Sequence, residues 1–257
     1  MWAATDRRLF LALLGPLIVL AWVVLWVWGQ SPYGRFLSHE ALGEVELTFG
    51  ADSLELVLAF VGGWTLMTVA MMLPTSLPLV TLFHTVVQQR PDRGRLVVLL
   101  IAGYLSTWAG FGFMAHLGDW GLHEAVERSA WLAANDWMIG PGILAVAGVY
   151  QFTPLKYRCL DKCRSPLSFI MEHWRGSHDR ARAFGLGVHH GLFCIGCCWS
   201  LMLLMFAVGV GNIGWMLVLG AVMAIEKNFP WGRRVSAPLG VGLVCWGLVL
   251  GLAAVLT

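Results

Sequence analysis

The chain has 257 residues, of which 58% are hydrophobic and only 12% are charged. Soluble domains carry about 25% charged residues. This composition therefore excludes an ordinary water-soluble domain and predicts a polytopic, all-α membrane bundle formed as a single domain by residues 1–257. The formal net charge is only +2 and the chain has no basic stripe, which argues against a nucleic-acid partner.

Seven apolar runs are long enough to cross a bilayer, for which a helix needs about 20 residues. In chain order they are residues 9–29, 55–82, 96–116, 132–152, 184–209, 212–229 and 238–256. The first run follows Arg7 and Arg8, as in a twin-arginine export signal. However, it is long for a signal-peptide core and no small-x-small cleavage site follows it, so we expect a retained transmembrane helix.

The basic residues predict the orientation of these seven spans. If the N-terminus faces the cytoplasm, only Arg35 and Arg128 of the 17 Lys and Arg residues fall in outer segments. Positive residues are concentrated in cytoplasmic segments of membrane proteins. We therefore predict seven transmembrane helices with the N-terminus in the cytoplasm and the C-terminus outside.

The second run contains the sequence WTLMTVAMMLPTSLP, which places three methionines at about the depth of the bilayer centre. Pro74 and Pro78 each prevent one intrahelical hydrogen bond, so the carbonyls of Ala70 and Pro74 need other partners. Interrupted helices at this depth often mark ion or substrate sites in transporters, although proline kinks also occur without that role. The three methionines are Met67, Met71 and Met72.

The long inner segment at 153–183 is the most basic one, and we expect a short amphipathic helix on the lipid headgroups there. It contains Cys159 and Cys163, whose spacing of four residues places both thiols on one face of a helix. Metal binding and a structural role are equally compatible with this pair.

The fifth run contains HHGLFCIGCCWSLMLLM, residues 189–205, near the bilayer centre. Helical spacing predicts one stripe of soft donor atoms along this helix. Its members are His190, Cys194, Cys197 or Cys198, Met202 and Met205. No cysteine lies in an outer segment, so a disulfide framework is not expected.

Thiolate, thioether and imidazole groups together suit a soft metal ion. Cys and Met favour Cu(I), whereas Zn²⁺ favours Cys and His, so copper is the expected metal and zinc the less favoured one. A single buried Cys or Met is usually a packing residue, and we interpret Cys245 in that way. The predicted ligands are Cys194, Cys197, Cys198, His190, Met67, Met71, Met72, Cys159, Cys163 and Met202.

Glu226 and Lys227 end the sixth run at its inner boundary. Acids near the hydrocarbon layer are uncommon and are usually paired or functional. Neighbouring residues do not share a helix face, so we expect Glu226 to pair across the bundle or to meet water.

The stretches WTLMTVAMMLPTSLP, YQFTPLKYRCLDKCRSP, GLGVHHGLFCIGCCWSLMLLMFAVGVGN and AIEK resemble the bacterial DUF2182 family over about residues 55–230. The resemblance implies a metal-binding protein of the inner (cytoplasmic) membrane, similar to copper chaperones. It also implies that the predicted cysteine, histidine and methionine ligands, Pro74 and Glu226 occupy motif positions. One departure is Gly211, where family members tend to have a methionine before the Asn, so this chain lacks the contact that such a methionine would make with a metal at that end of the fifth run.

The favoured function is a copper-handling membrane protein that acts as a chaperone, a carrier or an assembly factor. Cu(I) is expected between the second and fifth runs, in exchange with Cys159 and Cys163. A copper enzyme or a soluble copper-binding protein is the expected partner, besides the lipid bilayer. The chain has no G-x-x-x-x-G-K-[ST] motif, which argues against an ATP-driven pump.

Two alternatives stay open. Cys194 and Cys197 form a C-x-x-C pair that suits a membrane thiol–disulfide oxidoreductase, although the other cysteine pair faces the reducing side. The chain also fits a non-catalytic subunit of a larger membrane complex, with the outer segment at 30–53 as the docking surface. Of these interpretations, a carrier without enzymatic activity is preferred.

Overall fold

The structure is a computed structural model that describes residues 2–30, 51–174, 179–208 and 212–256, and all regular elements in this part are helices. Most of the segment at 30–53, Gly211 and Arg35 lie outside the described residues. The long helices are α1 (Trp2–Gln30), α3 (Ala51–Val86), α4 (Arg93–Arg128), α9 (Asp179–Val208), α10 (Ile213–Asn228) and α11 (Ser236–Leu256). The short ones are α5 (Ala130–Ala134), η2 (Asp136–Met138), α6 (Ile139–Tyr150), α7 (Pro154–Arg164), α8 (Pro166–His173) and η3 (Gly232–Val235).

Within the described residues, four helical stretches are long and apolar enough to cross a membrane, and a fifth is formed if one bent pair counts as a span. The bent pair joins Asp136–Tyr150 to Pro154–Arg164 at an angle of 63°. The four are Val57–Val86, Arg93–Arg128, Asp179–Met205 and Gly232–Leu256. The chain is therefore compatible with membrane insertion, whereas seven spans and the orientation of both ends stay predictions.

The differences from the expected spans have local causes. The run at 132–152 is not one straight helix, because α5 ends at Ala134 and a 3-10 turn precedes α6. α10 has 16 residues, which corresponds to about 24 Å at 1.5 Å per residue and is shorter than the hydrocarbon layer.

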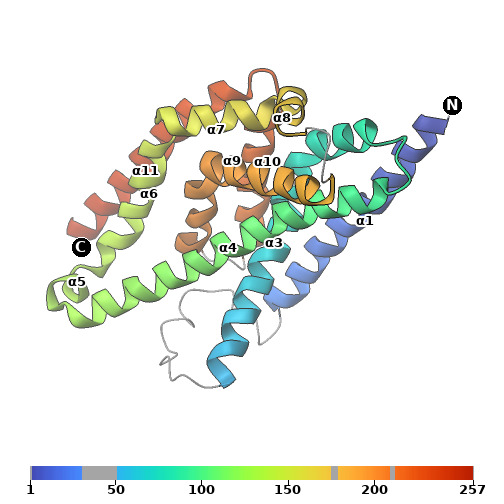
Figure 1. Ribbon diagram of the computed structural model, residues 1–257. Coiled ribbons are helices and arrows are strands. Elements are labelled where there is room, and N and C mark those ends of the chain that lie inside the picture. The colour runs from blue at the N-terminus through green and yellow to red at the C-terminus, as the bar shows by residue number, and fades with distance from the viewer. Residues whose placement is uncertain (1, 31–50, 175–178, 209–211, 257) are drawn as a thin grey trace.

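The longest helices cross the molecule side by side (Figure 1). α4 packs along α9, α3 packs on α4, α1 packs on α3, and α6 lies beside α11 at the opposite end. Two glycines make the α4–α9 contact possible. A Cβ on Gly187 would overlap the backbone of Leu100, and one on Gly103 would overlap the backbone of Phe184. Small residues allow this close approach of helix backbones in membranes.

The two prolines do not interrupt α3, which continues from Ala51 to Val86 with Pro74 and Pro78 inside it. As expected, the carbonyl of Ala70 finds another donor, because Trp22 Nε1 on α1 donates a hydrogen bond to it at 3.1 Å. The freed carbonyl is thus satisfied by protein, and it links α1 to α3 near the methionines.

The segment after α6 folds back onto the bundle as α7 and α8. Thr153 caps α7 by accepting a hydrogen bond from the Lys156 amide at 3.3 Å, and Pro154 starts the helix. α7 packs extensively on α9 rather than lying only on headgroups. Leu155, Leu167 and Met171 on α7 and α8 are nevertheless exposed, so part of this surface is apolar enough to contact lipid.

An ion pair fixes the start of α9 to the turn between α3 and α4. Arg90 donates a hydrogen bond to Asp92 at 3.2 Å and pairs with Asp179 at 2.6 Å. The hydrogen bond with Asp92, together with the charge of Asp179, raises the pKa of Arg90. The guanidinium therefore links the turn after α3 to the first turn of α9 at the protein surface.

Candidate metal centre

The soft donors of α9 point into the protein interior and not to its outer surface. His190 is 3% exposed, and the cysteines and methionines of the predicted stripe are 1% exposed or less. The three methionines of α3 are buried to the same degree. The stripe predicted from helical spacing therefore forms a buried face. α4, α6, α7 and α10 pack on α9, and side chains of α3 reach it as well.

Three sulfur atoms converge on one cationic nitrogen. Lys227 Nζ at the end of α10 donates to Cys194 Sγ at 2.9 Å and to Thr75 Oγ1 at 3.2 Å. It also lies 3.8 Å from Met72 Sδ and 4.0 Å from Cys198 Sγ. Cys198 Sγ is 3.7 Å from Met72 Sδ. We call Met72, Cys194 and Cys198, with Lys227 between them, the sulfur site.

Tyr104 brings α4 into contact with the sulfur site. Its hydroxyl lies 3.1 Å from Cys194 Sγ, and either atom can be the donor. The Tyr104 ring stacks on His190 with 5.7 Å between ring centroids. Cys194 therefore touches polar groups from two other helices, α4 and α10. The thiols of Cys197 and Cys198 instead donate to the Cys194 carbonyl, at 3.1 and 2.8 Å.

The cysteine pair of α7 reaches the same stretch of α9. Cys163 Sγ is 4.0 Å from Cys197 Sγ. Cys159 packs against Gly196, where a Cβ would overlap its sulfur atom. Tyr150 donates a hydrogen bond to the Gly196 carbonyl from the end of α6. The expected shared face of Cys159 and Cys163 is thus turned toward α9, with Cys159 buried and Cys163 half-buried.

Other predicted ligands are buried nearby but face different groups. His190 Nε2 lies 3.1 Å from Ser76 Oγ, and its Nδ1 has no hydrogen-bond partner. Met71 faces α10, where its Cε lies 3.6 Å from the point that a Cβ added to Gly220 would occupy. Met67 and Met202 are fully buried. These four residues stay predicted ligands.

The sulfur site is not a closed coordination shell as it stands. Within the described part of the chain, no three His, Cys, Asp or Glu side chains are arranged so that they could hold a metal ion. The distances from Lys227 Nζ to the three sulfur atoms also exceed a metal–sulfur bond of about 2.3 Å. The donor chemistry nevertheless fits a soft cation, since two thiols and a thioether face one point.

A comparison with known protein families shows to which family this chain belongs. A family model described as PpoB2, a copper chaperone, matches residues 61–250. The chain belongs to this family. The match contains every predicted ligand, and the family name agrees with the copper-chaperone likeness inferred from the sequence. No curated protein and no solved structure matches the chain.

In this PpoB2 family member, sequence reasoning missed a buried polar network beside the sulfur site. Lys156 donates to both carboxylate oxygens of Glu226, at 2.7 and 3.0 Å, and to Gln151. Ser236 donates to Glu226 at 2.6 Å. Glu226 thus pairs across the bundle, as expected. One signal in the sequence could have indicated this network. Gln151 and Lys156 both lie in the motif YQFTPLKYRCLDKCRSP, which carries the family resemblance.

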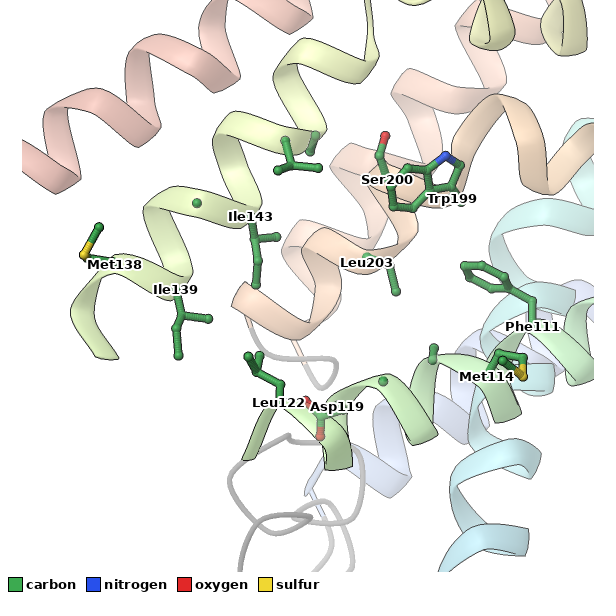
Figure 2. Close-up of a pocket in the computed structure, with 15 residues that line it drawn as sticks. Phe111, Met114, Asp119, Leu122, Met138, Ile139, Ile143, Trp199, Ser200 and Leu203 are labelled. Carbon is green, nitrogen blue, oxygen red and sulfur yellow. The ribbon is translucent and has the colours of Figure 1, made fainter. Parts of the chain in front are cut away.

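One cavity among the described residues of this PpoB2 family member lies away from the sulfur site. It has a volume of about 630 Å³ and separates α4, α6 and α9. Figure 2 shows Ile143 of α6 facing Leu203 of α9, with Phe111 and Asp119 of α4 along the other side. Its lining is almost wholly apolar and includes none of the cysteines. The groove therefore offers the thioethers of Met114 and Met138 but no thiol.

Proposed function

We propose that this chain is a membrane copper chaperone that carries Cu(I), its cargo, on Met72, Cys194 and Cys198. The observation that supports this most directly is the convergence of their sulfur atoms on the Lys227 nitrogen, within 4.0 Å. Sulfur atoms that already surround one positive charge are well placed to bind a softer cation. The membership in a copper-chaperone family supports the same function.

The donor set favours Cu(I) over Zn²⁺. Structural zinc sites use four Cys or His ligands in a tetrahedron. The sulfur site offers two thiols and a thioether, and its fourth neighbour is the hydroxyl of Thr75. His190, the imidazole nearest along the stripe, faces Ser76 instead. A thioether is a ligand that selects Cu(I) among the common ions.

We propose that Cys159 and Cys163 exchange copper with this site. Cys163 is half-buried, whereas Cys197 is fully buried, and their sulfur atoms are 4.0 Å apart. An ion with metal–sulfur bonds of about 2.3 Å can bridge two sulfur atoms at that separation. Cu(I) would thus pass from Cys163 to Cys197 by ligand exchange, without a change of oxidation state.

In this proposal the chain spans the bacterial inner membrane seven times, and α7 lies on the cytoplasmic side. A soluble copper-binding protein or a copper enzyme would exchange copper with Cys163. The exposed apolar residues of α7 and α8, including Leu167 and Met171, would hold this surface at the lipid headgroups.

A thiol–disulfide oxidoreductase is the second candidate, because Cys163 and Cys197 face each other from different helices. Rapid thiol trapping in intact cells separates the two functions. A disulfide between Cys163 and Cys197 supports the oxidoreductase, and fully reduced thiols support the chaperone.

Copper retention by the purified protein tests the proposed function. The protein in detergent, loaded with Cu(I) and desalted, is expected to keep about one ion per chain, as one trigonal sulfur site would. A variant with Cys194→Ser and Cys198→Ser is expected to lose it, since hydroxyl groups are poor ligands for Cu(I). Cys245→Ser is the control, because Cys245 is exposed on α11. Equal retention by the double variant would contradict the proposal.

A further inference from the structure

Lys227 is an unusual residue for a site that binds cations. Its side chain is 6% exposed, and no ion pair of the described residues includes it. The carboxylate of the preceding residue, Glu226, is turned away and is occupied by Lys156 and Ser236. The contacts of the Lys227 ammonium are three sulfur atoms and the hydroxyl of Thr75.

Burying an ammonium group without a carboxylate is costly unless other acceptors compensate it. The sulfur atoms of Met72, Cys194 and Cys198 are therefore the acceptors that keep Lys227 inside. Copper in the proposed site needs the same sulfur atoms and the same space. Two cations within one cage repel each other strongly, because the interior screens charge poorly.

We propose that Lys227 is a built-in competitor of copper: its ammonium fills the sulfur site when copper is absent and must withdraw when copper binds. This inference rests on the proposed function. The competition lowers the affinity for Cu(I) and speeds its release, because the returning ammonium takes up the sulfur atoms that the departing ion leaves. A chaperone needs both properties, since it must give its cargo away.

The location of Lys227 allows its ammonium group to leave the sulfur site and extend toward water. It lies in the last turn of α10, and the residues that follow it, Asn228 and Phe229, are exposed. A lysine has a flexible four-carbon stem that can extend toward water while its methylene groups stay in apolar surroundings. Withdrawal therefore needs a side-chain rotation at the helix end and not a rearrangement of the bundle.

Lys227→Leu tests the competition, since Leu removes the charge and, unlike Met, adds no sulfur ligand for Cu(I). Titration of loaded protein with the Cu(I) chelator bicinchoninate gives the Kd and the release rate. We expect a Kd about tenfold lower or more, within the usual range of coupling between two ligands, and slower release. Lys162→Leu is the control, because Lys162 is exposed and pairs with Glu172 at 2.6 Å.

The outcomes of this titration are distinct. If the unaltered protein and Lys227→Leu bind copper with the same Kd and release rate, or if Lys227→Leu binds more weakly, the inference is wrong and the proposed function stands. If neither protein binds copper, the proposed function falls and the inference falls with it.

A measurement on the unaltered protein covers the case in which Lys227→Leu does not fold. The lysines of the chain are Lys156, Lys162 and Lys227, so amine labelling read by mass spectrometry follows each one. We expect copper to increase the labelling of Lys227, and to leave the exposed Lys162 and the buried Lys156 unchanged. Unchanged protection of Lys227 in copper-loaded protein would overturn the inference.

Discussion

At the residue scale, two buried lysines beside the sulfur site have opposite surroundings. Lys156 is 0% exposed and faces the carboxylate of Glu226 and the amide of Gln151. Lys227 faces sulfur. A buried charge with a hydrogen-bonded partner is held in one place, whereas one with weak acceptors is easier to displace. Lys156 is therefore suited to fix the structure and Lys227 to move.

The pair of Lys156 and Glu226 makes a prediction about stability. Glu226→Gln leaves the Lys156 ammonium buried and without its counter-charge, and breaking a buried pair in this way costs about 3–5 kcal/mol. We expect a clear fall in the thermal unfolding midpoint of the detergent-solubilised protein. The control is Glu172→Gln, which breaks the exposed pair with Lys162 and should cost about 1 kcal/mol or less. Equal midpoints for the two variants would refute the structural role of Glu226.

At the element scale, the sulfur site depends on how closely α4 and α9 approach. Gly103 and Gly187 bring the two backbones together, and Tyr104 follows Gly103 directly, so its hydroxyl reaches Cys194. α7 depends on a similar contact, in which Gly196 leaves room for Cys159. Small residues on α4 and α9 therefore determine which side chains of neighbouring helices can meet the cysteines.

Two glycines of α9, two residues apart, provide a matched test of this contact. A Cβ on Gly187 would overlap the Leu100 carbonyl, whereas Gly185 has nothing within 4 Å of that position. We expect Gly187→Ala to destabilise the protein by about 1–3 kcal/mol through overpacking. Gly185→Ala should be neutral or stabilise it by about 0.5–1 kcal/mol, because Ala favours helix. Equal unfolding midpoints would show that the backbones do not touch there.

Local patterns predicted the helices better than they predicted the contacts between them. Helical spacing found the buried stripe of α9, and the proline rule found the Ala70 carbonyl that needs a new donor. The meeting of Cys163 with Cys197 is a tertiary contact, which no spacing within α7 or α9 encodes. Lys227 was missed because a lysine at the end of an apolar run usually extends to the membrane surface.

At the scale of the whole molecule, the number of crossings decides where the C-terminus lies. Seven spans with a cytoplasmic N-terminus place the C-terminus outside. α10 is the helix on which this number depends, because its 16 residues are fewer than a membrane span usually needs. If α10 did not cross, the number of spans would be even and both ends would lie on the same side.

Reporter fusions at the C-terminus test this topology. We expect alkaline phosphatase, which is active only outside the inner membrane, to be active there, and green fluorescent protein to be dark when exported unfolded. Fusions after α6, near Gln151, serve as the internal control, because the expected topology puts that point in the cytoplasm. A fluorescent C-terminal fusion would mean that α10 does not cross.

The central claim is that copper is held by sulfur from α3 and α9. X-ray absorption at the copper edge of the loaded protein tests it most directly. We expect a Cu(I) edge and a first shell of sulfur alone at about 2.3 Å, lost when Cys194 and Cys198 are both replaced by serine. A first shell of nitrogen or oxygen, or an unchanged sulfur shell in that double variant, would contradict it.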